Sequence, residues 1–210
     1  MYKKLSQEQL AELIRAGISE FAEKSYEKAN LSSIARRAGI SVGVIYKYYE
    51  DKDAFFLACV RECLNDLHDI LKEAAVKSDN LRDSIESVIR ALIKHAREHR
   101  DINRMYHEIT SKGADRFAKF LAKEVEEMSA IVYVDLIRKA QEEGMCRKDA
   151  NPGLFAFFFD NLFMMIQFSF CCDYYMERIK LYCGENIFDD DELVATELGK
   201  FLFGALDIQA

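Results

Sequence analysis

Helix-breaking residues are scarce in this chain, which holds one proline and nine glycines among its 210 residues. Both residues are unfavourable inside helices, so their scarcity favours a mostly helical protein. No stretch alternates apolar and polar residues in the manner of a strand, and the sequence contains no internal repeat. We therefore expect an all-α fold of about nine helices.

Motifs that would point to catalysis or to a bound metal are also missing. The sequence has no glycine-rich phosphate loop, no nucleophile elbow and no HExxH motif, so we expect neither an enzyme nor a cofactor. None of the six cysteines forms a CxxC pair, and Cys59 with Cys63 lacks a second pair at metal-ligand spacing. His95 and His99 are one helical turn apart, but the charged residues around them predict a solvated face. We expect no metal site.

A membrane-spanning segment and an excess of positive charge are absent as well. The most apolar stretch, residues 154–172, is interrupted by Asp160, Asn161 and Gln167, and the N-terminus shows no apolar leader. We expect a cytoplasmic protein that is not inserted in a membrane. The net charge is −7, yet residues 1–56 carry +1 and the remainder carries −8. Any nucleic-acid binding by the N-terminal part would therefore depend on a few well-placed cations.

The residues that are present predict two short helices in a helix-turn-helix arrangement, preceded by a longer helix. Apolar residues at helical spacing predict the longer helix over residues 6–24, with Glu20 and Glu23 on its outer face. The two short helices are expected over residues 31–38 and 42–48, each after a residue that suits an N-cap. In such an arrangement the second short helix enters the major groove of DNA.

The steep crossing of the two short helices places demands on particular positions. It requires a small residue in the first short helix and a glycine in the turn, and Ala35 and Gly39 meet these demands. The apolar residues that would lock both helices in place are Ile34, Ala38, Ile40, Ile45 and Tyr48. The residues predicted to face the groove are Ser41, Val42, Gly43, Val44 and Lys47. An ordinary helical hairpin with polar caps would imitate part of this pattern.

The run from Ile34 to Phe55, IARRAGISVGVIYKYYEDKDAF, closely resembles the head of the TetR (tetracycline repressor) family. The resemblance extends from Ile14 to about Val60. It implies that several residues contact DNA phosphates, one at an N-cap, two as tyrosines and one at the start of the fourth helix. These residues are Asn30, Tyr46, Tyr48 and Lys52.

Two features depart from the family pattern or limit what it implies. Ser25 stands where a glycine usually follows the first helix, so that turn is expected to differ in detail. Val42 and Val44 make the recognition helix apolar, which favours contact with thymine methyl groups over bidentate hydrogen bonds. No base sequence for the operator follows from such residues.

One helix in the rest of the chain is apolar on nearly all sides. It begins at Pro152 and is expected to run to about Tyr182. Such a helix must be buried on more than one face, by an internal core or pocket and by a partner. This helix contains several polar residues, and buried polar groups need partners, which could be a ligand or a neighbouring helix. The predicted contacts of a small, largely apolar effector are Asp160, Phe163, Met164 and Gln167.

The last helix, expected over residues 190–207, presents an apolar stripe. The family resemblance implies that the last two helices form a four-helix dimer interface with those of a second copy. The predicted interface residues are Phe158, Val194, Leu198, Phe201, Leu202 and Ala205. The residues taken alone would fit an ordinary helical core equally well.

The sequence thus predicts a helix-turn-helix DNA-binding domain over residues 1–50 and a ligand-binding and dimerisation domain over residues 51–210. The resemblance implies a homodimeric repressor that binds a palindromic DNA operator and is released by an effector. Two alternatives stay open. One is a helical ligand-binding or structural protein that has lost DNA binding, and the other is a helical enzyme built on a pocket in the second domain.

Overall fold

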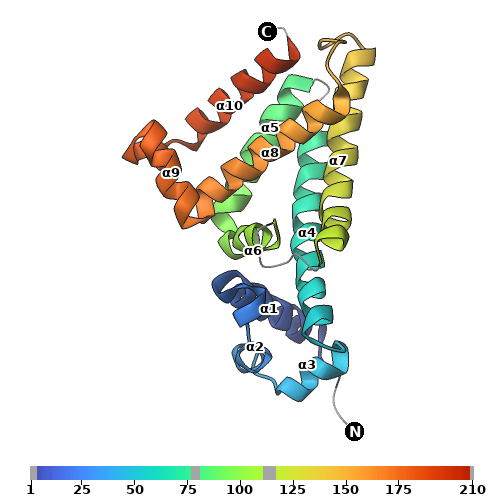
Figure 1. The fold of residues 1–210 in the computed structure, drawn as a ribbon, viewed down its shortest axis with the longest axis vertical. Helices are drawn as coiled ribbons and strands as arrows, with labels where there is room; N and C mark the ends of the chain where they lie inside the picture. The colour runs from blue at the N-terminus through green and yellow to red at the C-terminus, as the bar shows by residue number, and fades with distance from the viewer. Residues whose placement is uncertain (1–3, 77–80, 111–116, 209–210) are drawn as a thin grey trace. The chain divides into compact units, whose positions relative to one another are not determined.

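The computed structural model describes residues 4–76, 81–110 and 117–208 (Figure 1). Every regular element within these residues is helical, so the prediction of an all-α fold is confirmed. In chain order the elements are α1 (Gln7–Lys28), α2 (Leu31–Arg37), α3 (Val42–Tyr48), α4 (Lys52–Val76), α5 (Leu81–Glu98), α6 (Arg100–Thr110), α7 (Ala118–Glu142), α8 (Pro152–Cys171), α9 (Asp173–Cys183), the 3-10 helix η2 (Glu185–Asp189) and α10 (Asp191–Leu206).

The chain forms two compact units. The first unit consists of Met1–Asp66 with Asp101–Lys119, and the second consists of Leu67–Arg100 with Phe120–Ala210. The chain passes from one unit to the other within α4, at the start of α6 and at the start of α7. The functional division of the chain after residue 50 stays a prediction.

α1 has a capped start and a kinked end. The Ser6 hydroxyl accepts a hydrogen bond from the Gln9 N–H at 3.2 Å, and the Gln9 side chain accepts one from the Ser6 N–H at 3.0 Å. At Ser25 the backbone has φ 63° and ψ 165°, a region that residues with a Cβ rarely adopt. The chain therefore makes a glycine-like turn with serine, at the position where the family pattern has glycine.

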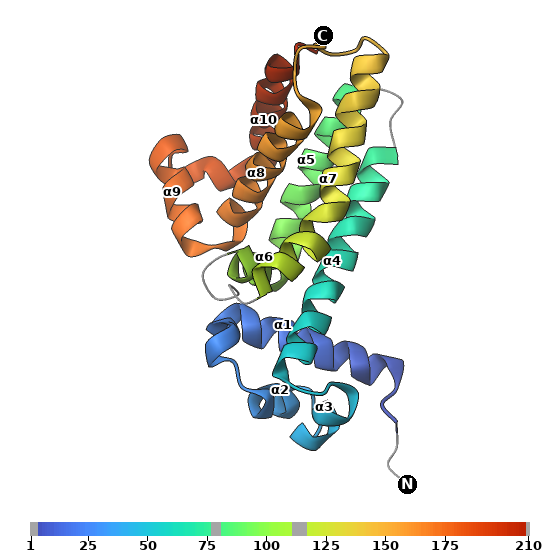
Figure 2. The same cartoon turned by 45° about the vertical axis from the view of Figure 1, so that its right-hand side comes forward.

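α2 and α3 are joined by a tight turn, visible beside α1 in Figure 2. Gly39 has φ +65° and donates its N–H to the Arg36 carbonyl at 3.3 Å. The Ile40 N–H donates to the Ala35 carbonyl at 2.9 Å. This pair of bonds is the Schellman motif, which ends a helix at a left-handed residue and suits glycine. Gly39 therefore occupies the turn, as the sequence predicts.

Apolar side chains from α1 to α4 fill the core of the first unit. Its fully buried members include Leu13, Phe21, Ile34, Ile45, Phe55 and Phe56. α1 lies close to α4 at Gly17, where an added Cβ would lie 2.6 Å from Cζ of Phe55. A larger residue at position 17 would force the two helices apart and disturb this core.

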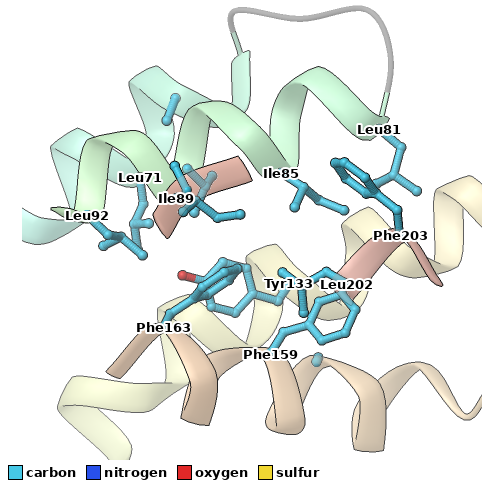
Figure 3. Packing of buried hydrophobic residues seen from close by; sticks show 14 of the residues in the cluster. Leu71, Leu81, Ile85, Ile89, Leu92, Tyr133, Phe159, Phe163, Leu202 and Phe203 are labelled. Carbon is cyan, nitrogen blue, oxygen red and sulfur yellow. The ribbon is translucent and has the colours of Figure 1, made fainter. Parts of the chain in front are cut away.

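α5, α8 and α10 pack together in the second unit, and α7 and the end of α4 complete its core. Figure 3 shows aliphatic side chains of α5, such as Ile85 and Ile89, opposite aromatic side chains of α7 and α8. The rings of Tyr133 and Phe163 meet edge to face, with 5.5 Å between their centroids. α8 is thereby fixed on one side, which determines which of its residues face outward.

The prediction of one long helix from Pro152 to about Tyr182 is wrong, because two helices cover this segment. α8 ends at Cys171, Cys172 has an extended backbone with φ −107° and ψ 124°, and α9 begins at Asp173. No proline or glycine marks this break, so helical periodicity did not reveal it. The two helices also differ in burial, since eight residues of α8 are buried and none of α9 is.

α10 is attached to α5 in two ways. Near the N-terminus of α10, Arg90 donates hydrogen bonds to both carboxylate oxygens of Glu192, at 2.6 and 2.9 Å. Arg97 donates to both oxygens of Asp191, at 2.6 and 2.5 Å. Toward its C-terminus, α10 instead places apolar side chains such as Leu202 in the core. Charged pairs therefore add to the packing of Val194 and Ala195 at one end of this helix, whereas apolar packing alone holds the other.

Among the described residues, α8 is the one helix long and apolar enough to cross a membrane by length and composition. The core helix of a globular unit passes the same test. Burial of eight α8 residues against the rest of the second unit fits a core helix. The remainder of α8 is exposed or half-buried.

Candidate nucleic-acid interface

α3 turns one face outward from the first unit. Ile45 is its buried residue and fixes the opposite face on the core. The exposed residues of α3 are Val42, Gly43, Tyr46 and Lys47, and Val44 is half-buried. The Tyr46 side chain is 54% exposed. Ser41 occupies the N-cap without a capping hydrogen bond from its hydroxyl, so it also belongs to the outward face.

Lys52, in the first turn of α4, is held by the end of α1. Its Nζ donates to the Glu27 carbonyl at 3.3 Å and lies 4.7 Å from the centre of the Tyr26 ring. The Tyr26 hydroxyl donates a hydrogen bond to Asp53, also in the first turn of α4. These contacts fix a positive charge at a helix N-terminus, where anions are favoured.

Tyr48 and Asn30, two of the predicted phosphate contacts, have structural hydrogen bonds of their own. The Tyr48 hydroxyl accepts a hydrogen bond from the Leu5 N–H at 2.6 Å and so holds the segment before α1. Accepting this bond uses a lone pair, so the hydroxyl proton can still be donated to a phosphate oxygen. The Asn30 side chain caps α2 by accepting from the Ser32 N–H at 2.8 Å.

The prediction that Glu20 lies on the outer face of α1 is wrong, because this residue is 0% exposed. Its carboxylate accepts hydrogen bonds from Lys24 Nζ at 2.8 Å and from the Asn30 N–H at 3.3 Å. The Ser33 hydroxyl donates a third bond at 3.1 Å. Burial alone would raise the pKa of Glu20, but these hydrogen bonds and the charge of Lys24 hold it below its ordinary value. Glu20 thus fixes the start of α2 on α1.

Arg37 is a second link between α2 and α1. It donates to Glu23 at 2.7 Å and to the Ser19 hydroxyl at 3.3 Å, and it lies 3.5 Å from the Glu20 carboxylate. The hydrogen bond to Glu23 raises the pKa of Arg37 above its ordinary value. The charge of Arg37 is therefore paired with carboxylates of the first unit, whereas the neighbouring Arg36 is exposed to solvent.

The predicted effector residues on α8 differ in burial. Phe163 and Gln167 are buried, and Asp160 and Met164 are half-buried. Gln167 Nε2 donates to the Phe163 carbonyl at 3.3 Å, but its Oε1 has no hydrogen-bond partner in the described part of the chain. Asp160 likewise has no hydrogen-bond partner among the described residues, and burial raises its pKa to about 6. Both groups can accept a hydrogen bond from a bound molecule.

The predicted dimer residues do not share one surface. Phe158 and Phe201 are 52% and 64% exposed, Leu198 and Ala205 are half-buried, and Val194 and Leu202 are buried in the core of the second unit. The exposed apolar residues of α8 and α10 also include Leu154, Phe157 and Leu193, which helical periodicity did not single out. The apolar residues exposed on α8 and α10 are therefore only partly those of the predicted interface.

The prediction of a solvated face at His95 and His99 is wrong for His95, which is 2% exposed. His95 follows Val88 by two helical turns and so continues the buried stripe of α5. The two histidine rings stack with 4.8 Å between their centroids. They line a groove of about 280 Å³ between α4 and α5, together with Ile70, Ala74, Ser87, Ala91, Lys94 and Glu98.

Residues 13–59 match the model of the bacterial regulatory proteins of the tetR family. Similarity to curated proteins extends over little more than a third of the chain. The HTH-type transcriptional regulator BetI of Stenotrophomonas maltophilia is 30% identical over 79 residues, which cover 37% of this chain and 40% of BetI. The chain therefore spans about 40% of the length of this relative.

Similarity to solved structures extends over nearly the whole chain. The fatty acid degradation regulator FadR from Bacillus halodurans has a TM-score of 0.75 at 18% identity, covering 94% of this chain and 99% of its own. FadR from Bacillus subtilis, solved in complex with stearoyl-CoA, has a TM-score of 0.71 at 14% identity, covering 92% and 97%. At these identities the likeness shows the fold alone. Residues 13–59, which contain α2, the Gly39 turn and α3, are therefore similar to the corresponding part of the bacterial regulatory proteins of the tetR family.

Proposed function

We propose that this protein is a transcriptional repressor that binds double-stranded DNA through α3 and releases it when an effector occupies the second unit. The observation that carries the proposal is the outward face of α3, which Gly39 and the buried Ile45 hold in place. Val42 and Gly43 begin this helix, and the N-terminal residues of a recognition helix meet base edges. Their small side chains suit close approach to the groove floor and to thymine methyl groups.

The phosphate contacts of this proposal come from few residues. Tyr46 and Lys47 are exposed on α3, and Lys52 is fixed at the start of α4. Because residues 1–56 carry a net charge of only +1, these cations would supply much of the electrostatic attraction. Such contacts position the protein on DNA, and base contacts select the sequence.

The same proposal includes a homodimer formed through α8 and α10. Leu154, Phe157, Phe158 and Phe201 are each more than half exposed, although the opposite faces of their helices lie in a well-packed core. Large exposed apolar surfaces mark interaction sites. A twofold dimer would read a palindromic operator whose half-sites lie about 34–36 Å apart.

The effector of the proposed repressor would be small and largely apolar, and it would act in the cytoplasm. Phe163 and Met164 offer apolar contact, while Gln167 Oε1 and the Asp160 carboxyl lack hydrogen-bond partners among the described residues. An effector that carries a hydrogen-bond donor would satisfy these acceptors. Its binding would favour a conformation with a different separation of the two heads.

DNA binding is tested by footprinting on flanking genomic DNA, followed by measurements of affinity at several salt concentrations. Lys52→Ala should weaken binding to all sequences and lower the slope of log affinity against log salt by about one unit per subunit. Tyr46→Phe should also weaken binding to all sequences, and the exposure of Tyr46 makes misfolding a poor explanation. Lys94→Ala is the matched control, since Lys94 is exposed on α5. An unchanged slope for Lys52→Ala would contradict the assigned phosphate contact.

Dimerisation is tested by sedimentation of charge-introducing variants. Phe158→Glu and Phe201→Glu should yield monomers, because a charge in the centre of an apolar interface loses its hydration. Tyr174→Glu is the control, since Tyr174 is 72% exposed but lies on α9. A dimer that persists in both phenylalanine variants would place the interface elsewhere.

Effector binding is tested by a thermal-shift screen of apolar molecules, followed by an assay of operator release. Acyl-CoA thioesters belong in the screen because the Bacillus subtilis FadR structure contains stearoyl-CoA. Ligands that stabilise the protein should bind more weakly to Phe163→Ala, Met164→Ala and Gln167→Ala. If all three variants keep full affinity, the effector site is not at these residues.

The alternative function is a helical ligand-binding or structural protein that has lost DNA binding. It predicts that footprinting protects no site, while dimerisation and ligand stabilisation are unaffected. The exposed Tyr46 and Lys47 and the Gly39 turn favour the repressor, because a protein without DNA contacts has no need of this surface.

A further inference from the structure

Cys171 and Cys172 form a pair of neighbouring thiols at the corner between α8 and α9. Their Sγ atoms are 3.6 Å apart, and the residues are 0% and 9% exposed. The corner brings the thiols together because Cys172 leaves the helical conformation, with φ −107° and ψ 124°. In a continuous helix, neighbouring side chains point about 100° apart around the axis.

The separation of the two sulfur atoms suits a single bridging atom better than a disulfide bond. Two thiolates bound at about 2.3 Å to one tetrahedral centre lie about 3.8 Å apart, and they lie somewhat closer at the narrower angles of a pyramidal trivalent centre. A disulfide normally needs Cα atoms at least about 4.4 Å apart, whereas neighbouring Cα atoms lie about 3.8 Å apart. Oxidation would therefore strain the corner, while a bridging soft atom requires little movement of the sulfur atoms.

The other cysteines do not share this arrangement. The Sγ of Cys59 lies 3.9 Å from the Ile14 carbonyl, and that of Cys63 lies 3.8 Å from Met105 Sδ. Cys146 is buried near the Ile137 carbonyl, and Cys183 is exposed. In the part of the chain that the structure describes, Cys171 and Cys172 belong to no group of three or more potential metal ligands. A soft centre that needs two sulfur atoms fits this pair better than zinc, which takes three or four protein ligands.

We propose that the α8–α9 corner binds trivalent arsenicals through Cys171 and Cys172. An organic arsine oxide, R–As=O, reacts with two thiols: both S–H bonds and the As=O bond break, and two As–S bonds form. The two protons and the oxygen leave as one water molecule. Arsenic stays trivalent, so the step needs no oxidant or reductant.

α9 gives a route to these buried thiols. It has no buried residue, and it contacts α8 and η2. Elements with few buried contacts open locally at low free-energy cost. The ring of Phe168 on α8 pairs with that of Tyr175 on α9, with 5.5 Å between their centroids, and opening α9 breaks this contact at the corner.

The test is titration of the full-length reduced protein with phenylarsine oxide, read by native mass spectrometry and by alkylation of the remaining thiols. The expected result is one adduct per chain, with Cys171 and Cys172 protected from alkylation. Cys171→Ser and Cys172→Ser should each weaken binding on the order of 100-fold or more, because the second thiol acts at high effective concentration. Cys146→Ser and Cys183→Ser are the buried and exposed controls and should bind like the wild type.

Two further measurements keep the proposal falsifiable. Circular dichroism and a second variant, Cys172→Ala, separate loss of the thiol from loss of the fold. The dithiol 2,3-dimercaptopropanol should remove the adduct, whereas a monothiol at equal thiol concentration should not. The proposal would be overturned if the wild type bound phenylarsine oxide no more tightly than Cys172→Ser does. It would also be overturned if a different pair of cysteines were protected. The titration contains no DNA, so its outcome is independent of the proposed repressor function.

Discussion

Replacing Glu20 with glutamine probes how α2 is held on α1. The substitution keeps the size of the side chain but removes the charge that four donors surround. The amide oxygen can still accept from the two donors at one carboxylate oxygen, Lys24 and the Asn30 N–H, while the new NH₂ group must face Ser33 and Arg37 at the other. The Ser33 hydroxyl and Arg37 are therefore the donors that would lose their acceptor.

The size of the effect follows from which donors water can reach. A hydrogen bond to a charged group contributes about 1.5–3 kcal/mol, and an orphaned buried donor costs about 1–3 kcal/mol. The Lys24 and Arg37 side chains are 43% and 36% exposed, so water replaces much of what they lose. We expect Glu20→Gln to lower the free energy of unfolding by about 2 kcal/mol, and to weaken DNA binding because α2 loses its fixed position.

The loss should also depend on pH. The folded-state pKa of Glu20 lies below its ordinary value of 4.5, so ionised Glu20 stabilises the fold fully above about pH 4.5. As the pH falls through the lowered pKa, the folded protein takes up the proton and this stabilisation disappears. The difference in stability between the wild type and Glu20→Gln should therefore shrink in acid.

The assay is urea unfolding followed by circular dichroism, at neutral pH and at progressively lower pH. Glu23→Gln is the control, because the Glu23 side chain is 45% exposed and its loss should cost no more than about 0.5 kcal/mol. Wild-type stability of Glu20→Gln at neutral pH would refute the reasoning. The reasoning would also be refuted if the difference in stability between Glu20→Gln and the wild type stayed constant as the Glu20 carboxylate is protonated.

Three other substitutions test separate features. Ser25→Gly should raise the free energy of unfolding by about 1 kcal/mol, because glycine adopts φ 63° and ψ 165° without strain; a lower Tm would contradict a strained turn. Asp160→Asn should stabilise the protein by at most about 3 kcal/mol above pH 6 and have little effect below pH 3.8. Burial raises the pKa of Asp160 from 3.8 to about 6, so ionisation of the wild type destabilises the fold as the pH rises through this range. In urea unfolding, the stability curves of the variant and the wild type must converge in acid. Gly39→Val should cost about 1–2 kcal/mol and weaken DNA binding while the dimer persists, because valine disfavours φ +65°; wild-type DNA affinity would show that the α2–α3 turn is not critical to the interface.

The helix-turn-helix could be predicted closely because its signals are local and agree with one another. A glycine in the turn, a capping asparagine and buried isoleucines at helical spacing all describe the same short segment. Gly39, Asn30, Ile34 and Ile45 each occupy the place that the pattern predicted. Within such a segment, backbone geometry depends mainly on neighbouring residues.

The errors arose where tertiary contacts decide the outcome. Helical periodicity treats every carboxylate as exposed, but donors from α1 and α2 bury Glu20. The break at Cys172 has no helix-breaking residue, so it depends on packing around the corner. Val194 and Phe157 show a third limit. Apolar character alone cannot tell which side of a helix faces its own core and which faces outward.

The attachment of α10 has a consequence for experiments that vary ionic strength. Its first turn is joined to α5 by partly exposed arginine–carboxylate pairs, whose attraction dissolved ions screen. The apolar side chains of its last turns are not weakened in this way. Val194 and Ala195 also pack the beginning of α10 in the core, so added salt should weaken only the charged part of its attachment, and with it one edge of the proposed dimer surface. A fall in DNA affinity with salt would then combine counterion release at the phosphates with a softer dimer. Comparing each variant with the wild type in the same buffer separates these two contributions.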